Sequence, residues 1–259
     1  MLYEEFDPPA RQRERVVSYW HFAVREEDPP AFEHVIVPDG TASLACAWIA
    51  PAGRAFASYV GPRRTALRLM VFRDSRYWGV RFKPGAAPLP GVGRLLDKSG
   101  ALAEILPDAD VGWIEKVKAS SPVEEVLGLL EVVVDRLSAG AGKIDGAVAR
   151  AVKRVEEARG LVSAEELAEV AGLSARQFLR RFRAAAGLTP KEYARMRRVR
   201  WACVQAVLGE ESPGWAGLAG ESGFADQAHL SREFRRVFGW TPRMTEEYLK
   251  RIEHRRVRG

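Results

Sequence analysis

The sequence predicts an α+β protein with a β-rich N-terminal domain, residues 1–138, and an all-α C-terminal domain, residues 139–259. Short β-favouring runs fill roughly the first hundred residues, and apolar residues recur at helical spacing after them. A Ser-Ala-Gly-Ala-Gly stretch at 138–142 has the composition of a linker. A chain of 259 residues with 47% apolar residues is long enough to bury two cores.

The N-terminal elements are predicted from runs and turn signals. HVIVP, LRLMVF and YWGVRF have strand composition, and PDG, PAG and GPRR are turn signals that separate such runs. This pattern indicates a small antiparallel sheet or barrel. Helical spacing then begins with Trp113, Ile114 and Val117, and it continues from Val123 to Leu137, which predicts helices that close the domain.

The C-terminal elements are predicted from helix start and stop signals. Ser163-Ala-Glu-Glu166 and Ser174-Ala-Arg-Gln177 have capping-box spacing, and Pro190 follows a capping threonine. Glycines at 160, 172 and 187 stand where helices are expected to end. We therefore expect a succession of short helices throughout residues 139–259.

The positive charge of the chain is concentrated in its C-terminal part. The formal net charge is +6, but residues 141–259 hold 23 Lys and Arg against 15 Asp and Glu. A polyanion is the expected partner of this part, because each Lys or Arg beside a phosphate releases condensed counterions. Duplex DNA and a membrane surface are the two candidates.

The cysteine positions and the short apolar segments exclude several classes of protein. Cys46 and Cys203 lie far apart without Cys/His clustering, which argues against a disulfide framework and a structural zinc site. The N-terminus has no apolar signal segment, and the run VLGLLEVVV is short and contains Glu131. We expect a soluble, cytoplasmic protein without a membrane partner.

One internal repeat lies in the basic half of the chain. The segment LAEVAGLSARQFLRRFRAAAGLTP, residues 167–190, matches LAGESGFADQAHLSREFRRVFGWTP, residues 218–242, with one extra residue in the second copy. Each copy has a short helix, a glycine turn and a longer basic helix that begins at a capping residue, Ser174 or Asp226. A short helix, a turn and a longer basic helix is the arrangement of a helix-turn-helix. One copy would be a weak signal, whereas two copies in one basic segment are a strong one.

The longer helix of each copy has an apolar face, which is expected to pack on the shorter helix, and a polar face left for a partner. The apolar positions are Phe178 and Phe182 in the first copy and Leu230, Phe234 and Phe238 in the second. The polar positions are Arg176, Gln177, Arg180, Arg183, Gln227, Ser231, Arg232 and Arg235. Arg and Gln are the side chains that read guanine and adenine edges in the major groove.

From about Ile144 to Met244 the sequence resembles the DNA-binding domain of the AraC/XylS family of bacterial transcription regulators. SGFADQAHLSREFRRVFGWTP is the most specific part of this resemblance. The resemblance implies seven helices in two subdomains. The expected units are a first helix-turn-helix at about 163–186, a linking helix at about 190–208 and a second helix-turn-helix at about 214–238.

The family resemblance also implies how DNA is bound. Two recognition helices would enter successive major-groove segments on one face of the duplex, about 34 Å apart. Ala228 and His229 join the expected DNA contacts by their place in the second recognition helix. One departure is the opening helix of the second unit, where Gly217 and Gly220 each cost roughly 1 kcal/mol against Ala.

Some residues have a competing structural interpretation. Gln177 also has the position that closes a capping box. Leu179 lies near the predicted groove face, but extension of the apolar stripe is its favoured role. Arg197, Arg198 and Arg200 on the linking helix are expected either to touch phosphates or to keep a long helix soluble. The basic C-terminal tail, RIEHRRVRG, is expected to add at most nonspecific attraction.

The N-terminal part carries a second resemblance. PDGTASLACAW, GPR at 61–63 and GVRFKPG at 79–85 resemble the β-rich N-terminal region of a group of AraC-type proteins, which implies a cupin-like sensory or dimerisation module. Trp20, Trp48 and Trp78 are candidates to line an apolar ligand pocket, although aromatic residues on strands more often fill the core.

No metal site and no cofactor is expected in the N-terminal part. Its two histidines, His21 and His34, lie near Glu33 in the sequence without the spacing of a ligand cluster. Cys46 lacks the neighbouring cysteines that a metal-activated thiolate needs.

The predicted function is that of a sequence-specific transcription regulator that binds double-stranded promoter or operator DNA. Arg176, Arg180, Gln227 and Arg232 are the expected base contacts. RNA polymerase is a candidate partner, a small molecule or dimerisation is the candidate means of control, and both a monomer and a homodimer stay open. The alternatives are a nonspecific, architectural DNA-binding protein and an enzyme in the N-terminal barrel, for which no catalytic residues are recognised.

Overall fold

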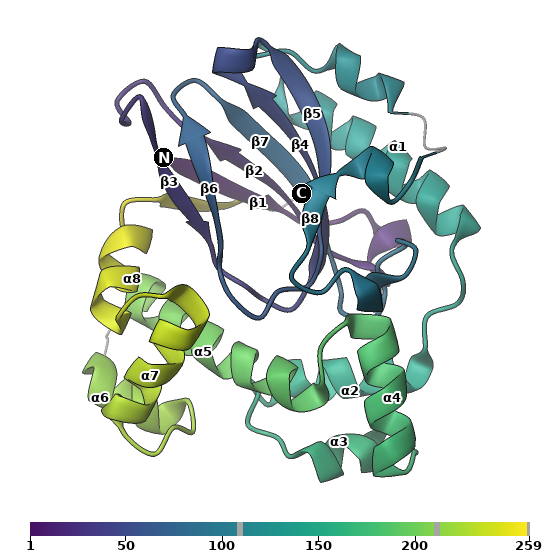
Figure 1. Cartoon of the computed structure of the whole chain (residues 1–259), viewed down its shortest axis with the longest axis vertical. Coiled ribbons are helices and arrows are strands. Elements are labelled where there is room, and N and C mark those ends of the chain that lie inside the picture. Colours follow the sequence, from purple (N-terminus) through teal and green to yellow (C-terminus); the bar gives the residue numbers. More distant parts are fainter. Residues whose placement is uncertain (108–110, 210–212, 258–259) are drawn as a thin grey trace.

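The computed structural model describes residues 1–107, 111–209 and 213–257. Figure 1 shows a β-rich N-terminal part with helix α1 beside it and the helices α2 to α8 gathered at one end of the sheets. The strands are β1 (Leu2–Phe6), β2 (Val16–Ala23), β3 (Ala31–Ile36), β4 (Ala42–Ile49), β5 (Arg54–Val60), β6 (Leu67–Phe72), β7 (Arg76–Phe82), β8 (Ser99–Ala101) and β9 (Glu253–Val257).

These strands form two sheets of unequal size. Seven strands make the larger sheet in the order β8-β5-β4-β7-β2-β1-β9, and β3 pairs with β6 in the smaller one. The runs LRLMVF and YWGVRF, predicted as strands, lie in β6 and β7. All pairs are antiparallel except β1 with β9, which is parallel.

One face of the large sheet packs on helix α1 (Val123–Gly140). Side chains alternate along a strand, so Trp78, Val80 and Phe82 of β7 lie on this face, and all three are completely buried. Helix α1 ends two residues beyond the predicted start of the linker at 138, because the backbone stays helical through Gly140. The helical spacing before it corresponds to a short 3-10 helix, Gly112–Lys116.

The other face of the large sheet is covered by the β3–β6 pair, and a cavity of about 540 Å³ lies between the two sheets. Trp20 and Phe22 of β2, with Tyr77 of β7, line it from the large sheet. Leu69 and Val71 of β6 line it from the small one. The N-terminal part is therefore a two-layered β structure with an apolar interior.

The C-terminal half is helical. Its helices are α2 (Gly146–Glu157), α3 (Ala164–Ala171), α4 (Ala175–Ala186), α5 (Pro190–Leu208), α6 (Gly214–Glu221), α7 (Gln227–Phe238) and α8 (Pro242–Leu249). Most begin at a side-chain cap, which satisfies backbone N–H groups that have no partner inside the helix. These caps are Asp145, Ser163, Ser174, Thr189, Asp226 and Thr241.

Helix α5 joins two small apolar cores. Its first half contributes Tyr193 and Met196 to a core with α2, α3 and α4. Its second half contributes Val199 and Cys203 to a core with α6, α7 and α8. The second core also includes N-terminal residues such as Tyr3, so the C-terminal unit is packed against the β-rich part.

The C-terminal tail forms a strand, which the sequence did not predict. Residues Glu253–Val257 pair in parallel with β1, and the N–H of Glu253 donates to the carbonyl of Met1 at 3.0 Å. The sequence indicated no structural role for this tail, whereas residues 253–257 form a paired strand. Its attraction to a polyanion stays a prediction, and residues 258–259 lie outside the described part of the chain. Among the described helices, none is long and apolar enough to cross a membrane.

Candidate nucleic-acid interface

Helix α4 is held in place by a turn, a cap and a buried face. Gly172 ends α3 at φ 69°, a left-handed conformation that glycine adopts without steric cost. The Ser174 hydroxyl accepts from the backbone N–H of Gln177 and starts α4. Phe178 and Phe182, 2% and 0% exposed, pack into the core with α2 and α3. The opposite face of α4 consequently meets solvent.

Three arginines occupy that exposed face. Arg176, Arg180 and Arg183 are exposed, and among the described residues none of them forms an ion pair. Gln177 is exposed as well, but its side-chain oxygen accepts from the N–H and the hydroxyl of Ser174. Gln177 thus closes a capping box, which leaves only its NH₂ group for a base.

Leu179 lies on the same surface, contrary to the expectation that it extends the apolar stripe. Its exposed fraction is 46%, whereas the buried positions of α4 are Phe178, Phe182 and Ala186. Leu179 lies four residues before Arg183, and this spacing places the two on one side of a helix. The structure thus favours the groove-face position, which the sequence had offered as the second interpretation of Leu179.

Arg181, next to this surface, is held in an ion pair within the protein although its side chain is exposed. On α4 itself, Arg181 donates through Nε and Nη2 to both oxygens of Asp145, at 2.7 and 2.6 Å. Asp145 caps α2 through the N–H groups of Ala147 and Val148. The Arg181 charge and hydrogen bond lower the pKa of the Asp145 carboxyl below its usual range. Arg181 therefore ties α4 to α2 and is not free for DNA.

The arginines of α5 are also internal. Arg197 forms an ion pair with Glu156, and Arg198 donates to the carbonyl of Gly223 at 3.0 Å and lies over the Phe224 ring. Arg200 lines a cavity between α5 and β1. The sequence predicted that these three side chains either touch phosphates or keep a long helix soluble. Instead they face other parts of the protein, because α5 is packed between the two helix-turn-helix units and against β1.

Helix α7 has the same construction as α4. Asp226 caps it by accepting from the N–H of His229 at 2.6 Å. Leu230, Phe234 and Phe238 are 0%, 0% and 2% exposed and fill the second core. The short helix α6 forms in spite of its two internal glycines and packs on both α5 and α7.

The opposite face of α7 carries the remaining predicted contacts. Gln227, Ala228, Arg232 and Arg235 are exposed, and Arg232 and Arg235 form no ion pair within the described ranges. Ser231 is half-buried. The nearby Glu233 faces inward to Arg195 of α5 at 3.3 Å, so its carboxylate does not neutralise this surface.

His229 is less available than the other α7 positions. Its side chain is half-buried, its ring meets the Phe224 ring edge to face, and its Nδ1 accepts from the N–H of Ala225. Together the exposed residues of α4 and α7 form two basic surfaces, one in each helix-turn-helix unit. Positive charge with free guanidinium groups is suited to phosphate oxygens and guanine edges.

The β-rich part places the predicted ligand-binding tryptophans on different faces. Trp20 lines the cavity between the sheets. Trp48 and Trp78 point to the other face, where Trp78 is completely buried against the α1 core. Neither lines the cavity, because the strand register places Gly79, not Trp78, opposite Trp20 and puts Trp48 on the same face as Trp78. These two side chains fill or border the core, the other interpretation that the sequence allowed.

The cavity has polar groups at its border. Arg63 lines it with a buried Nε that has no hydrogen-bond partner in the described part of the chain. Arg81, which also lines it, lies 3.1 Å from the carboxylate of Asp39. Burial alone would raise the pKa of Asp39, but the charges of Arg81 and Arg200 outweigh it and the pKa is lowered. The pair is therefore ionised at neutral pH.

The two histidines of the β-rich part have separate partners, and only His34 lines the cavity. His21 Nδ1 lies 3.0 Å from a carboxylate oxygen of Glu4, and His34 Nδ1 lies 2.6 Å from the Tyr248 hydroxyl. Across residues 1–107, 111–209 and 213–257, no group of three or more His, Cys, Asp or Glu side chains could hold a metal ion.

Comparison with known proteins places the repeat in a known family. A family model described as a helix-turn-helix domain matches residues 167–248. The HTH-type transcriptional activator RhaS of Escherichia fergusonii is 38% identical over 82 residues, which are 32% of this chain and 29% of the relative. The chain thus spans about three-tenths of that curated relative.

Two solved structures match parts of the chain with low TM-scores. The DNA-binding domain of AdpA in complex with a target DNA covers 40% of this chain and 94% of its own, with 28% identity and a TM-score of 0.36. Apo ToxT from Vibrio cholerae covers 87% of this chain and 98% of its own, with 14% identity and a TM-score of 0.44.

Proposed function

We propose, from the premise that residues 167–248 form an AraC-type helix-turn-helix domain, that the whole chain is a sequence-specific transcription regulator that binds double-stranded DNA. The observation that carries the proposal is the pair of exposed basic surfaces, each on the second helix of one helix-turn-helix unit. The name of RhaS, a transcriptional activator, supports it.

Helices α4 and α7 are the proposed recognition helices, each in one of two successive major-groove segments. Arg176 and Arg180 on α4, with Gln227 and Arg232 on α7, are the proposed base contacts, since their polar groups are exposed. Arg183 and Arg235, one turn or less further along, are proposed to support these contacts from the same surfaces. Ala228, His229 and Ser231 complete the surface of α7.

The domain division is proposed as a sensory or dimerisation domain, residues 1–138, and a DNA-binding domain, residues 139–259. The end of α1 at Gly140 supports a boundary close to this division. The cavity between the sheets is the proposed place for a small-molecule effector, with Trp20 among its apolar walls and Arg63 among its polar groups. We propose no catalytic role.

We propose the bacterial cytoplasm as the location, because promoter DNA is found there, and RNA polymerase as a candidate second partner. Promoter DNA is bound as a specific sequence, because free Arg and Gln side chains on a recognition helix discriminate bases as well as charge. An architectural DNA-binding protein would have the charge without the base preference.

The experiment that tests the proposal is selection of bound duplexes from a random library by the full chain, followed by affinity measurements at two salt concentrations. Two enriched boxes about one helical turn apart are expected, with a large ratio of specific to random binding. Enrichment of no sequence, together with a steep salt dependence on every duplex, would overturn it in favour of backbone contacts alone.

A further inference from the structure

The β3–β6 pair has one face on the cavity and the other toward the second helix-turn-helix unit. In its antiparallel register His34 lies opposite Leu69, and Val35 lies opposite Arg68. Opposite residues share a face, so His34 and Leu69 face the cavity, while Val35 and Arg68 belong to the other face. Arg68 is at the border, because its long side chain also lines the cavity while its guanidinium contacts the helical part. Val35 is only 2% exposed, so this face is covered around Val35, whereas Met70 on the same face is 53% exposed.

Arg68 makes the most direct contact of that face with a recognition helix. Its Nη2 donates to the carbonyl of Phe238, the last residue of α7. Its guanidinium lies over the Trp240 ring, 4.4 Å from the centroid, and pairs with Glu33 of β3. A cation at the end of a helix also interacts favourably with the helix dipole. One side chain of the β-rich part therefore fixes the C-terminal end of α7.

Three further hydrogen bonds support the same attachment. The N–H of Ala66 donates to the carbonyl of Val237 at 2.7 Å, next to the carbonyl that Arg68 binds. The N–H of Val35 donates to the Tyr248 hydroxyl at 3.2 Å, and the same hydroxyl lies 2.6 Å from His34 Nδ1. Both α7 and α8 are thus bonded to the β3–β6 pair and to the loop before β6.

The attachment leaves the DNA-facing side of α7 open. Gln227 and Arg232 are exposed, and they lie toward the start of the helix, whereas Val237 and Phe238 are at its end. A clamp on the last turn therefore orients the helix without covering the residues proposed to read bases.

The first recognition helix is attached differently. A Cβ on Gly93 would lie 2.7 Å from the carbonyl oxygen of Ala184, so the 3-10 helix Val92–Arg94 packs closely on the end of α4. Arg64 pairs with Glu192 of α5 at 2.9 Å, beside this contact. Arg68 does not take part here, and the two recognition helices have separate attachments to the β-rich part.

We propose that the β3–β6 pair sets the orientation of α7 on DNA and that Arg68 is its positioning residue. The inference rests on the proposed function, because it assigns a role in DNA binding to a residue that does not touch DNA. A change at Arg68 should therefore alter binding at the box read by α7 and leave the box read by α4 unchanged.

The test uses the full chain with duplexes from the library selection. The box read by α7 is the one whose base preference is relaxed by Arg232→Ala. Affinity is then measured for the intact duplex and for duplexes in which one box or the other is scrambled. Arg68→Ala is expected to weaken binding to the intact duplex about fivefold, the value of one lost hydrogen bond. On the duplex with a scrambled α7 box it should bind like the wild type.

Control variants separate positioning from folding and charge. Arg54→Ala removes an arginine of the same domain that lies over Phe56 of its own strand, and it should change nothing. Arg68→Lys keeps the charge without the planar fork and should recover part of the loss. Tyr248→Phe removes only the hydroxyl shared by His34 and Val35, and it should repeat the box-specific loss in a milder form if Arg68→Ala does not fold.

The outcomes are distinguishable. Three results would overturn the positioning role. The first is an equal loss of affinity on both scrambled duplexes. The others are unchanged binding by folded Arg68→Ala and Tyr248→Phe, and tighter binding by either variant. If the wild type binds intact and scrambled duplexes equally well, the proposed function itself fails and the inference falls with it.

Discussion

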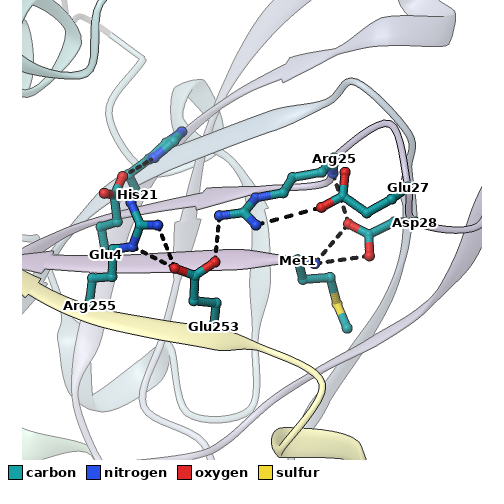
Figure 2. A network of polar contacts seen from close by, with 8 residues as sticks. All are labelled: Met1, Glu4, His21, Arg25, Glu27, Asp28, Glu253 and Arg255. Carbon is teal, nitrogen blue, oxygen red and sulfur yellow. Dashed lines mark hydrogen bonds and ion pairs between the residues drawn. The ribbon is translucent and has the colours of Figure 1, made fainter.

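The guanidinium of Arg25 donates to the carboxylate of Glu253 at 2.7 Å, across 228 positions of the sequence. Figure 2 shows this contact within a network that includes Glu27, Asp28 and the amino group of Met1. The network surrounds the parallel pair of β1 and β9, the place where the end of the chain joins the N-terminal sheet.

Removal of residues 253–259 is expected to loosen β1 without unfolding the helices. Every residue of β9 is exposed, so the strand is attached by hydrogen bonds and ion pairs and not by a buried face. Hydrogen exchange should show lost protection in Leu2–Phe6, whose partners in β9 are missing. Amides of α4 serve as the internal control, and unchanged exchange in β1 would contradict the expectation.

Arg232→Ala is expected to cost about 1–3 kcal/mol at the selected site and to relax base preference at one position. The reason is that Arg232 is exposed and free of ion pairs in the described ranges. Binding titrations on the selected duplex and on single-base variants measure both effects. Arg236→Ala is the matched control, since Arg236 lies on the same helix 4.0 Å from Glu233. An equal loss on random DNA would make Arg232 a phosphate contact.

Leu179 is expected to contact a thymine methyl group. It is an exposed apolar side chain between arginines proposed to enter the major groove, where the thymine methyl is the main apolar feature. Leu179→Ala should cost about 1 kcal/mol at one thymine. Deoxyuridine at that position should cost the wild type a similar amount and the variant nothing. Equal sensitivity of both proteins to deoxyuridine would refute the contact.

The attachment of α8 to β3 is expected to weaken in acid. Burial lowers the pKa of His34 to about 4. Between pH 6.5 and 4 the unfolded chain therefore takes up a proton at His34 that the folded chain does not, and the free energy of unfolding falls as the pH falls. The contribution of His34 is at most about 3 kcal/mol.

Urea denaturation at a series of pH values measures this dependence. His34→Gln, which does not titrate, should have a flatter profile than the wild type over the same range. A residual slope is expected in the variant, because burial also lowers the pKa of His21 and of His254. Identical profiles for the two proteins would show that His34 does not contribute.

The helices that carry the proposed site could be predicted because their signals are local. Ser174 and Asp226 cap α4 and α7 through the N–H groups three residues on, and the apolar spacing around Phe178 and Phe234 determines which face is buried. Strand composition likewise located β6 and β7. Caps, buried helix faces and strand composition depend on residues that are close in the sequence, so a short segment is enough to predict them.

Other features were decided by contacts between distant segments. Arg180 and Arg181 are adjacent and identical in type, yet only Arg181 is engaged, because Asp145 lies beside it across 36 positions. Trp20 and Trp78 both have strand composition, and only the pairing of β2 with β7 determines which one faces the cavity.

The clearest division between the two kinds of information is at the C-terminus. The basic composition of the tail predicted at most nonspecific attraction and no secondary structure. Residues 253–257 form a strand because the pairing of β1 with β2 leaves the other edge of β1 free, and the packing of the second helical core on Tyr3 brings the end of the chain to that edge. The sequence by itself determined the helices and their exposed arginines, and the tertiary structure decided how they are held, since backbone pairing depends on which edges meet and not on local composition.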